Sequence, residues 1–208
     1  MIIKFDHISF SGCKDKENEI LDFFKDYAIS FQERELCNID AKQQFFTEYH
    51  SKHDLIMLEH ESRIPIEVTL YDSCTYRNPI IDIKEEIIII KSTSKEKTAS
   101  FLKNIGFKEK NGRFYLKPVM DNKDVIVEVI EEAGELNSKL DNVGYSSMAF
   151  WVNNINKEHK KIMDMGYTVT EIEMLTVHEK CLKIFFVAGP CNEIIEFIGV
   201  GSVNSENN

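Results

Sequence analysis

Two short stretches, Asn104-Ile105-Gly106-Phe107 and Asp164-Met165-Gly166-Tyr167, share a pattern in which a predicted helix ends at glycine and an aromatic residue opens the next strand. Glycine suits this corner because it adopts the left-handed conformation of a helix end without strain. A β-rich segment and an amphipathic helix precede each corner, and strand-like segments follow it. Self-similarity at about 60–80 residues is typical of repeated supersecondary units.

Outward from these corners, the order strand, helix, strand, strand, strand is predicted three times. The first copy has strands over 5–10, 29–36, 54–58 and 64–71 and a helix over 17–27, with Gly12 expected to end the first strand. The second has strands over 86–91, 107–110, 113–117 and 125–131 and a helix over 95–105. The third has strands over 145–152, 167–177, 182–187 and 193–200 and a helix over 156–165. Each copy closes with a glutamate between β-forming residues: Glu67, Glu128 and Glu196.

The predicted division of the chain follows from these copies. We expect βαβββ modules over 1–73, 85–133 (a short one) and 143–201, with linkers over 72–84 and 134–142. The first module carries an insertion over 40–52, in which 43–46 is expected to form a short helix. The polar tail 202–208 is expected to be disordered.

Composition narrows the class of protein. The chain has 208 residues and a net charge of -10, and it contains no Lys/Arg-rich run, so nucleic acid is not an expected partner. Its apolar runs, such as Ile87 to Ile90, are far short of the roughly 20 residues of a membrane helix. The five cysteines form no CxxC pair, which predicts reduced thiols and a cytoplasmic protein.

Two motifs carry a resemblance to a known family. His7-Ile8-Ser9-Phe10 looks like the opening strand of the glyoxalase/bleomycin-resistance/dioxygenase (vicinal-oxygen-chelate) superfamily, and Ser147-Met148-Ala149-Phe150 takes the same place in the third module. Residues 186–197 resemble that family's closing hairpin. The resemblance implies an α+β fold of repeated βαβββ modules, which form curled, mixed β-sheet cups with helices on the outside.

The resemblance also implies a metal site in the cup. By position, His7, Glu67 and Glu196 would be the ligands of a divalent ion (Zn²⁺, Fe²⁺, Mn²⁺, Ni²⁺ or Co²⁺), and imidazole with carboxylates suits such ions. Ser147 stands where the family has a second histidine. If modules one and two pair instead of one and three, Glu128 replaces Glu196. With three modules in a family built on pairs, one module either pairs across a homodimer interface or serves as a cap.

The alternation of side chains along a β-strand predicts which of them point into the cup. If Ile66, Val68 and Leu70 face the helices, then Glu67, Thr69 and Tyr71 face the cup. Strict alternation in the first strand would place Phe5 and Ser9 on the face of His7. By contrast, His50-Ser51-Lys52-His53 reads as a loop, so we expect His50 and His53 to be surface residues, and likewise His159 and His178.

Three functions fit this pattern. The first is a metal-dependent lyase, isomerase or oxygenase that acts on a small oxygen-chelating substrate, with Glu67 or Glu196 moving a proton. Ring-cleaving dioxygenation is less favoured, because iron in that branch usually takes two histidines and one glutamate. The second is a metal-free protein that sequesters a small molecule, such as an antibiotic, as in the bleomycin-resistance branch. The third is a scaffold for association alone.

Overall fold

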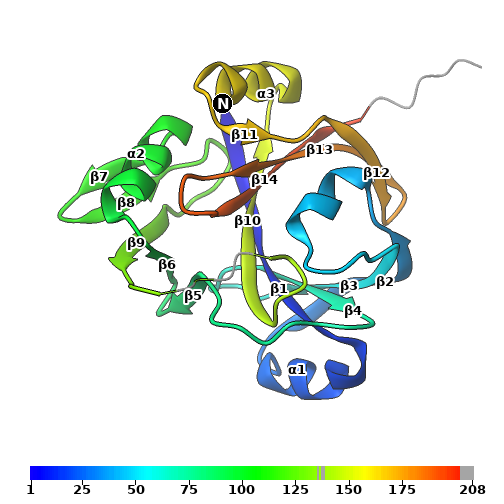
Figure 1. Cartoon of the computed structure of the whole chain (residues 1–208). Coiled ribbons are helices and arrows are strands. Elements are labelled where there is room, and N and C mark those ends of the chain that lie inside the picture. Colours follow the sequence, from blue (N-terminus) through cyan, green and yellow to red (C-terminus); the bar gives the residue numbers. More distant parts are fainter. Residues whose placement is uncertain (135, 137–138, 202–208) are drawn as a thin grey trace, which may run out of the picture.

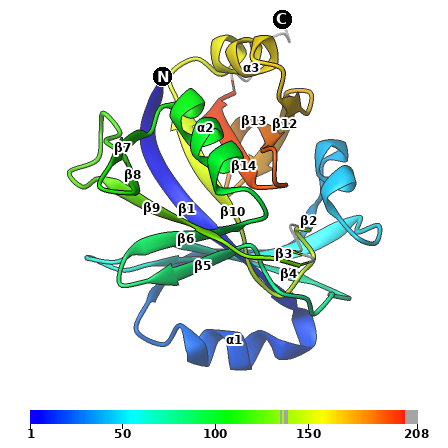
Figure 2. The same ribbon diagram turned by 60° about the vertical axis from the view of Figure 1, so that its left-hand side comes forward.

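A computed structural model of the chain describes residues 1–134, 136 and 139–201. The predicted disordered tail, 202–208, lies outside the described residues. The elements run in the predicted order, and the helices lie outside the sheets, with α1 and α3 at opposite ends of the molecule (Figures 1 and 2). Within the described ranges, no helix combines the length and the apolar character that a membrane crossing requires.

The elements of the three repeats have the following bounds. The first repeat contains β1 (Ile2–Cys13), the 3₁₀ helix η1 (Lys14–Lys16), α1 (Glu17–Phe23), β2 (Ala28–Cys37), the 3₁₀ helix η2 (Asp40–Phe45), β3 (Lys52–Glu59) and β4 (Ile66–Tyr71). The second contains β5 (Ile81–Lys84), β6 (Ile87–Ser92), α2 (Lys95–Ile105), β7 (Lys108–Lys110), β8 (Arg113–Leu116) and β9 (Val125–Glu131). The third contains β10 (Gly144–Val152), α3 (Ile155–Asp164), β11 (Thr168–Val169), β12 (Glu173–Val177), β13 (Lys180–Ala188) and β14 (Ile194–Val200).

Strand pairing repeats with the sequence. In each copy the first strand lies parallel to the last one: β1 beside β4, β6 beside β9, and β10 beside β14. The strands form one sheet in the order β11-β13-β14-β10-β1-β4-β3-β2, with β12 also on β13, and a second in the order β5-β6-β9-β8-β7. These parallel and antiparallel pairs confirm the α+β fold of repeated βαβββ units. The residue boundaries of the modules stay predictions.

The first and third repeats share the large sheet through an antiparallel pair of their opening strands, β1 and β10. Ile8 lies opposite Met148, and on either side of that pair His7 lies opposite Ala149 and Ser9 opposite Ser147. These two repeats therefore form one cup. The alternative in which the first and second repeats pair, with Glu128 in place of Glu196, is not the arrangement of this chain.

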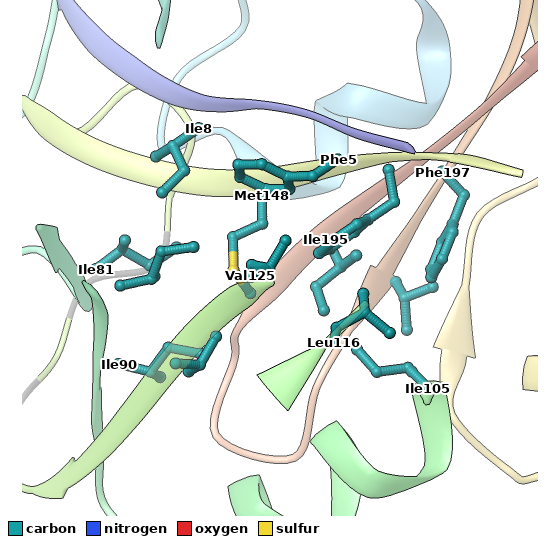
Figure 3. Close-up of a cluster of buried hydrophobic side chains, with 14 of the residues drawn as sticks. Phe5, Ile8, Ile81, Ile90, Ile105, Leu116, Val125, Met148, Ile195 and Phe197 are labelled. Atoms are coloured by element: carbon teal, nitrogen blue, oxygen red, sulfur yellow. The ribbon is translucent and has the colours of Figure 1, made fainter. Parts of the chain in front are cut away.

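The second repeat packs against the back of the large sheet. Ile81 of β5 and Ile90 of β6 share a hydrophobic core with Ile8 and Met148, the central pair of β1 and β10 (Figure 3). All four side chains are fully buried, each being 0% exposed. Of the two predicted roles for an unpaired module, the cap is therefore the one seen within this chain.

Three local predictions were wrong. β1 continues through Gly12, where a glycine fits because a Cβ would collide with the Ile20 side chain of α1. The helix predicted over 17–27 ends at Phe23, which is exposed. The linker predicted over 72–84 contains β5, which pairs with β6 across a tight turn at Glu85 and Glu86, both with positive φ.

The cysteines also differ from the prediction of reduced thiols. Cys13, at the end of β1, and Cys74, after β4, are paired as a disulfide, with Cα atoms 5.6 Å apart. That spacing lies within the usual range for disulfides. Cys37, Cys181 and Cys191 are free. Spacing in the sequence did not indicate the pair, because 61 positions separate the two residues and only the parallel β1–β4 pairing brings them together.

Candidate functional site

The cup of the large sheet holds a pocket of about 530 Å³. Side chains from both repeats line it: His53 of β3 and Glu67 of β4 come from the first, and Trp151 of β10 and Glu196 of β14 from the third. The apolar walls include Phe31, Leu55, Met57, Leu182 and Ile184. A concave, largely apolar cavity with a few convergent polar groups is the usual form of a small-molecule site.

A β-bulge in β1 places two adjacent side chains in this pocket. The pairing of β1 with β10 shifts register between Phe5 and His7, so Asp6 and His7 both line the pocket while Phe5 is in the core behind the sheet. Strict alternation had predicted Phe5 on the face of His7, which is wrong for this reason. Bulges commonly re-aim side chains next to functional sites.

Each ring nitrogen of His7 lies near at least one carboxylate. Its Nδ1 is 3.1 Å from Asp6 Oδ2, and its Nε2 is 3.5 Å from Glu67 Oε1 and 4.0 Å from Glu196 Oε2. The side chain is only 2% exposed, and Nε2 has no hydrogen-bond partner among the described residues. The structure thus brings together the three predicted site residues, with a buried donor atom aimed between two glutamates.

Asp6 orients the histidine and is itself held in place. It accepts hydrogen bonds from the Trp151 indole Nε1 at 2.7 Å and from Lys4 Nζ at 3.1 Å. Burial alone would raise the pKa of Asp6, but His7, Lys4 and Trp151 together hold it well below its usual range. Asp6 is therefore an ionised carboxylate that fixes the orientation of the His7 ring. Metal-binding histidines commonly have such a carboxylate on the ring nitrogen that does not face the metal.

Burial and neighbouring charge also shift the pKa values of the other two groups. Burial would lower the pKa of His7, but Glu67, Asp6 and Glu196 raise it to about 9. Burial, followed by the charge of Glu67, raises the pKa of Glu196 to about 7, against the opposing charges of Lys42 and His7. A carboxyl group that titrates near neutrality is suited to accept and return a proton.

Behind the glutamates the cup is lined with hydroxyl groups. Ser9 and Thr69 each donate to Glu67 Oε1 at 3.4 Å, and Ser147 donates to Ser9 Oγ at 3.0 Å. Together with Tyr71 they border a small space beneath Glu67 and Glu196. Glu67, Thr69 and Tyr71 thus face the cup as their alternation predicted, while Ile66, Val68 and Leu70 are in the core.

Register places the three closing glutamates at equivalent positions. On the parallel opening strand, Glu67 lies opposite Ser9, Glu196 opposite Ala149 and Glu128 opposite Ile89. Glu128, however, lies in the second repeat, away from the cup. Its Oε2 is 3.0 Å from Arg113 Nε, and its side chain is 35% exposed. Glu128 thus forms an ion pair with Arg113 at the surface, although its position in the second repeat corresponds to those of Glu67 and Glu196.

His50 of the module-one insertion and His53 of β3 are both buried, contrary to the prediction. His50 is 6% exposed and His53 is 1% exposed. They are buried because the insertion folds back as η2 over the cup, where both rings pack near Tyr71. His178 is exposed as predicted, whereas His159 is half-buried and its Nε2 lies 2.8 Å from the Thr170 carbonyl oxygen.

The donor set suits a divalent metal ion. Imidazole and carboxylate ligands fit Zn²⁺ and similar ions, and His7 Nε2 is a buried atom that a metal would satisfy. As the side chains stand, no three His, Cys, Asp or Glu residues in the described part of the chain form a metal-binding group. A bound ion would therefore require Glu67 and Glu196 to turn toward Nε2.

The sequence reasoning missed Asp6, Lys42 and His53, all of which line the pocket. The bulge that turns Asp6 inward has no signature in the residues of β1. Lys42 belongs to the insertion, and His53 follows it at the start of β3. The fold of the insertion over the cup depends on contacts with the third repeat: the amides of Asp40 and Ala41 donate to the Glu173 carboxylate. Lys42 directly precedes the short helix predicted over 43–46, and its residue type alone gave no signal of a place in the cup.

Comparison with known proteins gives fold neighbours only. No family model matches the chain, and no curated protein matches its sequence. Among solved structures, methylmalonyl-CoA epimerase from Mycobacterium tuberculosis is similar at 10% identity and a TM-score of 0.46, over 97% of this chain and 91% of that one. A glyoxalase I variant from Zea mays is similar at 12% identity and a TM-score of 0.39, over 94% and 67%.

A "putative dioxygenase" from Bacillus subtilis is similar at 12% identity and a TM-score of 0.42, over 97% of this chain. This chain spans 64% of that protein, which is less than two thirds of its length. At identities of 10–12%, these likenesses concern the fold and not the activity.

Proposed function

We propose that the cup holds a divalent metal ion through His7, Glu67 and Glu196, and that the protein is a lyase or isomerase acting on a small oxygen-chelating substrate. The observation that carries the proposal is the unpartnered, buried Nε2 of His7 between two carboxylates. Leaving such a polar atom without a partner is costly unless a ligand satisfies it. An oxygenase is less favoured, because Ser147 occupies the place of a second histidine.

Each residue has a distinct role in this proposal. The metal would act as a Lewis acid toward substrate oxygens. Glu67 or Glu196 would take a proton from the substrate and return it. Asp6 would hold the His7 ring in one orientation. The apolar walls would exclude water from the reacting carbon, which strengthens electrostatic interactions in the cup.

Metal analysis of the purified full-length protein tests the proposal. We expect about one divalent ion per chain after dialysis against trace metal, and loss of that ion in His7→Ala and Glu67→Gln. Glu128→Gln is the matched control, because Glu128 has the same register position in the second repeat but lies outside the cup. Absence of metal from the wild type, with a melting temperature that does not change on chelation or metal addition, would overturn the proposal.

A metal-free binding protein is the second candidate. Ser147, 1% exposed and bonded to Ser9, favours it because a serine hydroxyl is a poor substitute for a histidine ligand. Asp6, Glu67 and Glu196 would then suit a cationic ligand. A thermal-shift screen of the chelator-treated protein against cationic natural products tests this candidate, since a ligand that binds only the folded state raises its melting temperature.

A further inference from the structure

Lys42 is a buried lysine in the wall of the cup. It belongs to η2, is 7% exposed, and borders both the main pocket and the hydroxyl-lined space beneath Glu67 and Glu196. Its Nζ lies 5.8 Å from the centroid of the Phe186 ring. Its Nζ forms no hydrogen bond or ion pair with any of the described residues, although its charge acts on Glu196. A buried ammonium group of this kind calls for a negative partner.

His53 lies on β3, in the wall of the same pocket. It is 1% exposed, and neither ring nitrogen has a hydrogen-bond partner among the described residues. Burial, followed by the nearby charge of Lys42, keeps the pKa of His53 well below its usual value, so the ring is neutral. A neutral imidazole still donates one hydrogen bond. Among the described residues, therefore, the Lys42 ammonium group in this pocket has no counter-charge, and the N–H of His53 has no acceptor.

The balance of charges in a metal-bound cup indicates that the partner of Lys42 would be a negatively charged group on the ligand. Glu67 and Glu196 would match the two charges of a divalent ion, and Asp6 already faces Lys4, 3.1 Å away. Lys42 would then remain as a buried positive charge with no counter-charge. One negative charge on the ligand would restore neutrality, and it would lie beside His53.

We propose that Lys42 and His53 form an anion subsite, so that the ligand of the cup is a small carboxylate, such as a 2-oxo or 2-hydroxy acid. This inference rests on the proposed metal site for the position of the ligand's vicinal oxygens. The carboxylate lies toward η2, where the Lys42 ammonium and an N–H of His53 hold it, and the rest of the ligand contacts the apolar wall.

A matched pair of probes tests the subsite by calorimetry. Pyruvate and methyl pyruvate both offer vicinal oxygens, but only pyruvate is charged. For the Mn²⁺-loaded wild type we expect pyruvate to bind at least about tenfold more tightly than the ester, as a charge-assisted contact of about 1.5–3 kcal/mol implies. Lys42→Met should reduce this preference about tenfold, to what the metal alone provides, Lys42→Arg should keep it, and His53→Leu should weaken it.

Lys180→Met is the control, because Lys180 lines the same pocket but is exposed at its rim. It should leave the preference unchanged, since solvent screens its charge. Lys42→Met should also bind Mn²⁺ more tightly than the wild type, because it lacks a positive charge beside the site. Equal binding of pyruvate and its ester by the wild type, or an unchanged preference in Lys42→Met, would overturn the subsite.

The metal proposal and the subsite fail in different ways. If the wild type takes up no Mn²⁺, the proposed function fails. The subsite is then judged on the metal-free protein, where pyruvate should still bind more tightly than the ester, and only when Lys42 is present. Loss of that preference in the metal-free protein would overturn the subsite as well.

Discussion

At the scale of single residues, the bulge at Asp6 is the feature that organises the cup. It turns two neighbouring side chains to the same side, so that a carboxylate contacts the Nδ1 of His7 and leaves Nε2 facing Glu67 and Glu196. We predict that Asp6→Asn lowers metal affinity by about 10–100-fold, the usual cost of losing such a partner. Chelator competition measures this, with exposed Asp82→Asn as the control. Equal affinity in Asp6→Asn and wild type would contradict the assigned role.

His53 gives a second prediction at this scale, which concerns stability. Its pKa in the folded protein lies well below the value of 6.5 in the unfolded chain, because of burial and the charges of Lys42, Lys14 and His50. The unfolded chain therefore binds an extra proton as the pH falls through 6.5. His53 costs no stability above that pH, and below it stability falls by about 1.4 kcal/mol per pH unit.

Urea denaturation of wild type and His53→Leu at pH 7.5 and 5.5 checks this prediction. The difference in unfolding free energy between the two proteins should move by about 1.4 kcal/mol in favour of the variant at the lower pH. Carboxylates that titrate in this interval are common to both proteins and cancel in the comparison. A difference independent of pH would show that His53 is charged in the folded protein.

At the scale of elements, a buried glutamate joins the second repeat to the closing hairpin of the third. Glu193, 0% exposed, accepts hydrogen bonds from the Thr98 hydroxyl of α2 and from the Cys191 amide at 3.0 Å. We predict that Glu193→Ala lowers the free energy of unfolding by about 2–4 kcal/mol, because the buried Cys191 amide loses its acceptor and the Thr98 hydroxyl keeps only its contact with Ser92. Exposed Glu171→Ala should change it by less than about 0.5 kcal/mol. Similar denaturation midpoints for the two variants would refute the proposed link.

At the scale of the whole molecule, the second repeat covers the back of the sheet that forms the cup. Ile88 of β6 is fully buried in the shared core, whereas the next residue, Ile89, faces the other side of the strand and is half-buried. We expect Ile88→Ala to cost about 2–5 kcal/mol and Ile89→Ala to cost much less. Both variants should unfold in one transition, because the cap and the cup share a core. A separate early transition of the second repeat would contradict this view.

The sequence by itself determined the repeat. The glycine corners, the closing glutamates and the order of strands and helix are local patterns, and they predicted the βαβββ units and the inward direction of Glu67, Thr69 and Tyr71. The tertiary structure decided which repeats pair, since the apolar β1, β6 and β10 all read as suitable opening strands. It also decided the neighbours of His7, because the bulge at Asp6 and the fold of the insertion over the cup depend on contacts between distant segments. The alternation of apolar and polar residues along a strand indicates which face is buried, but it does not indicate which segment packs against that face.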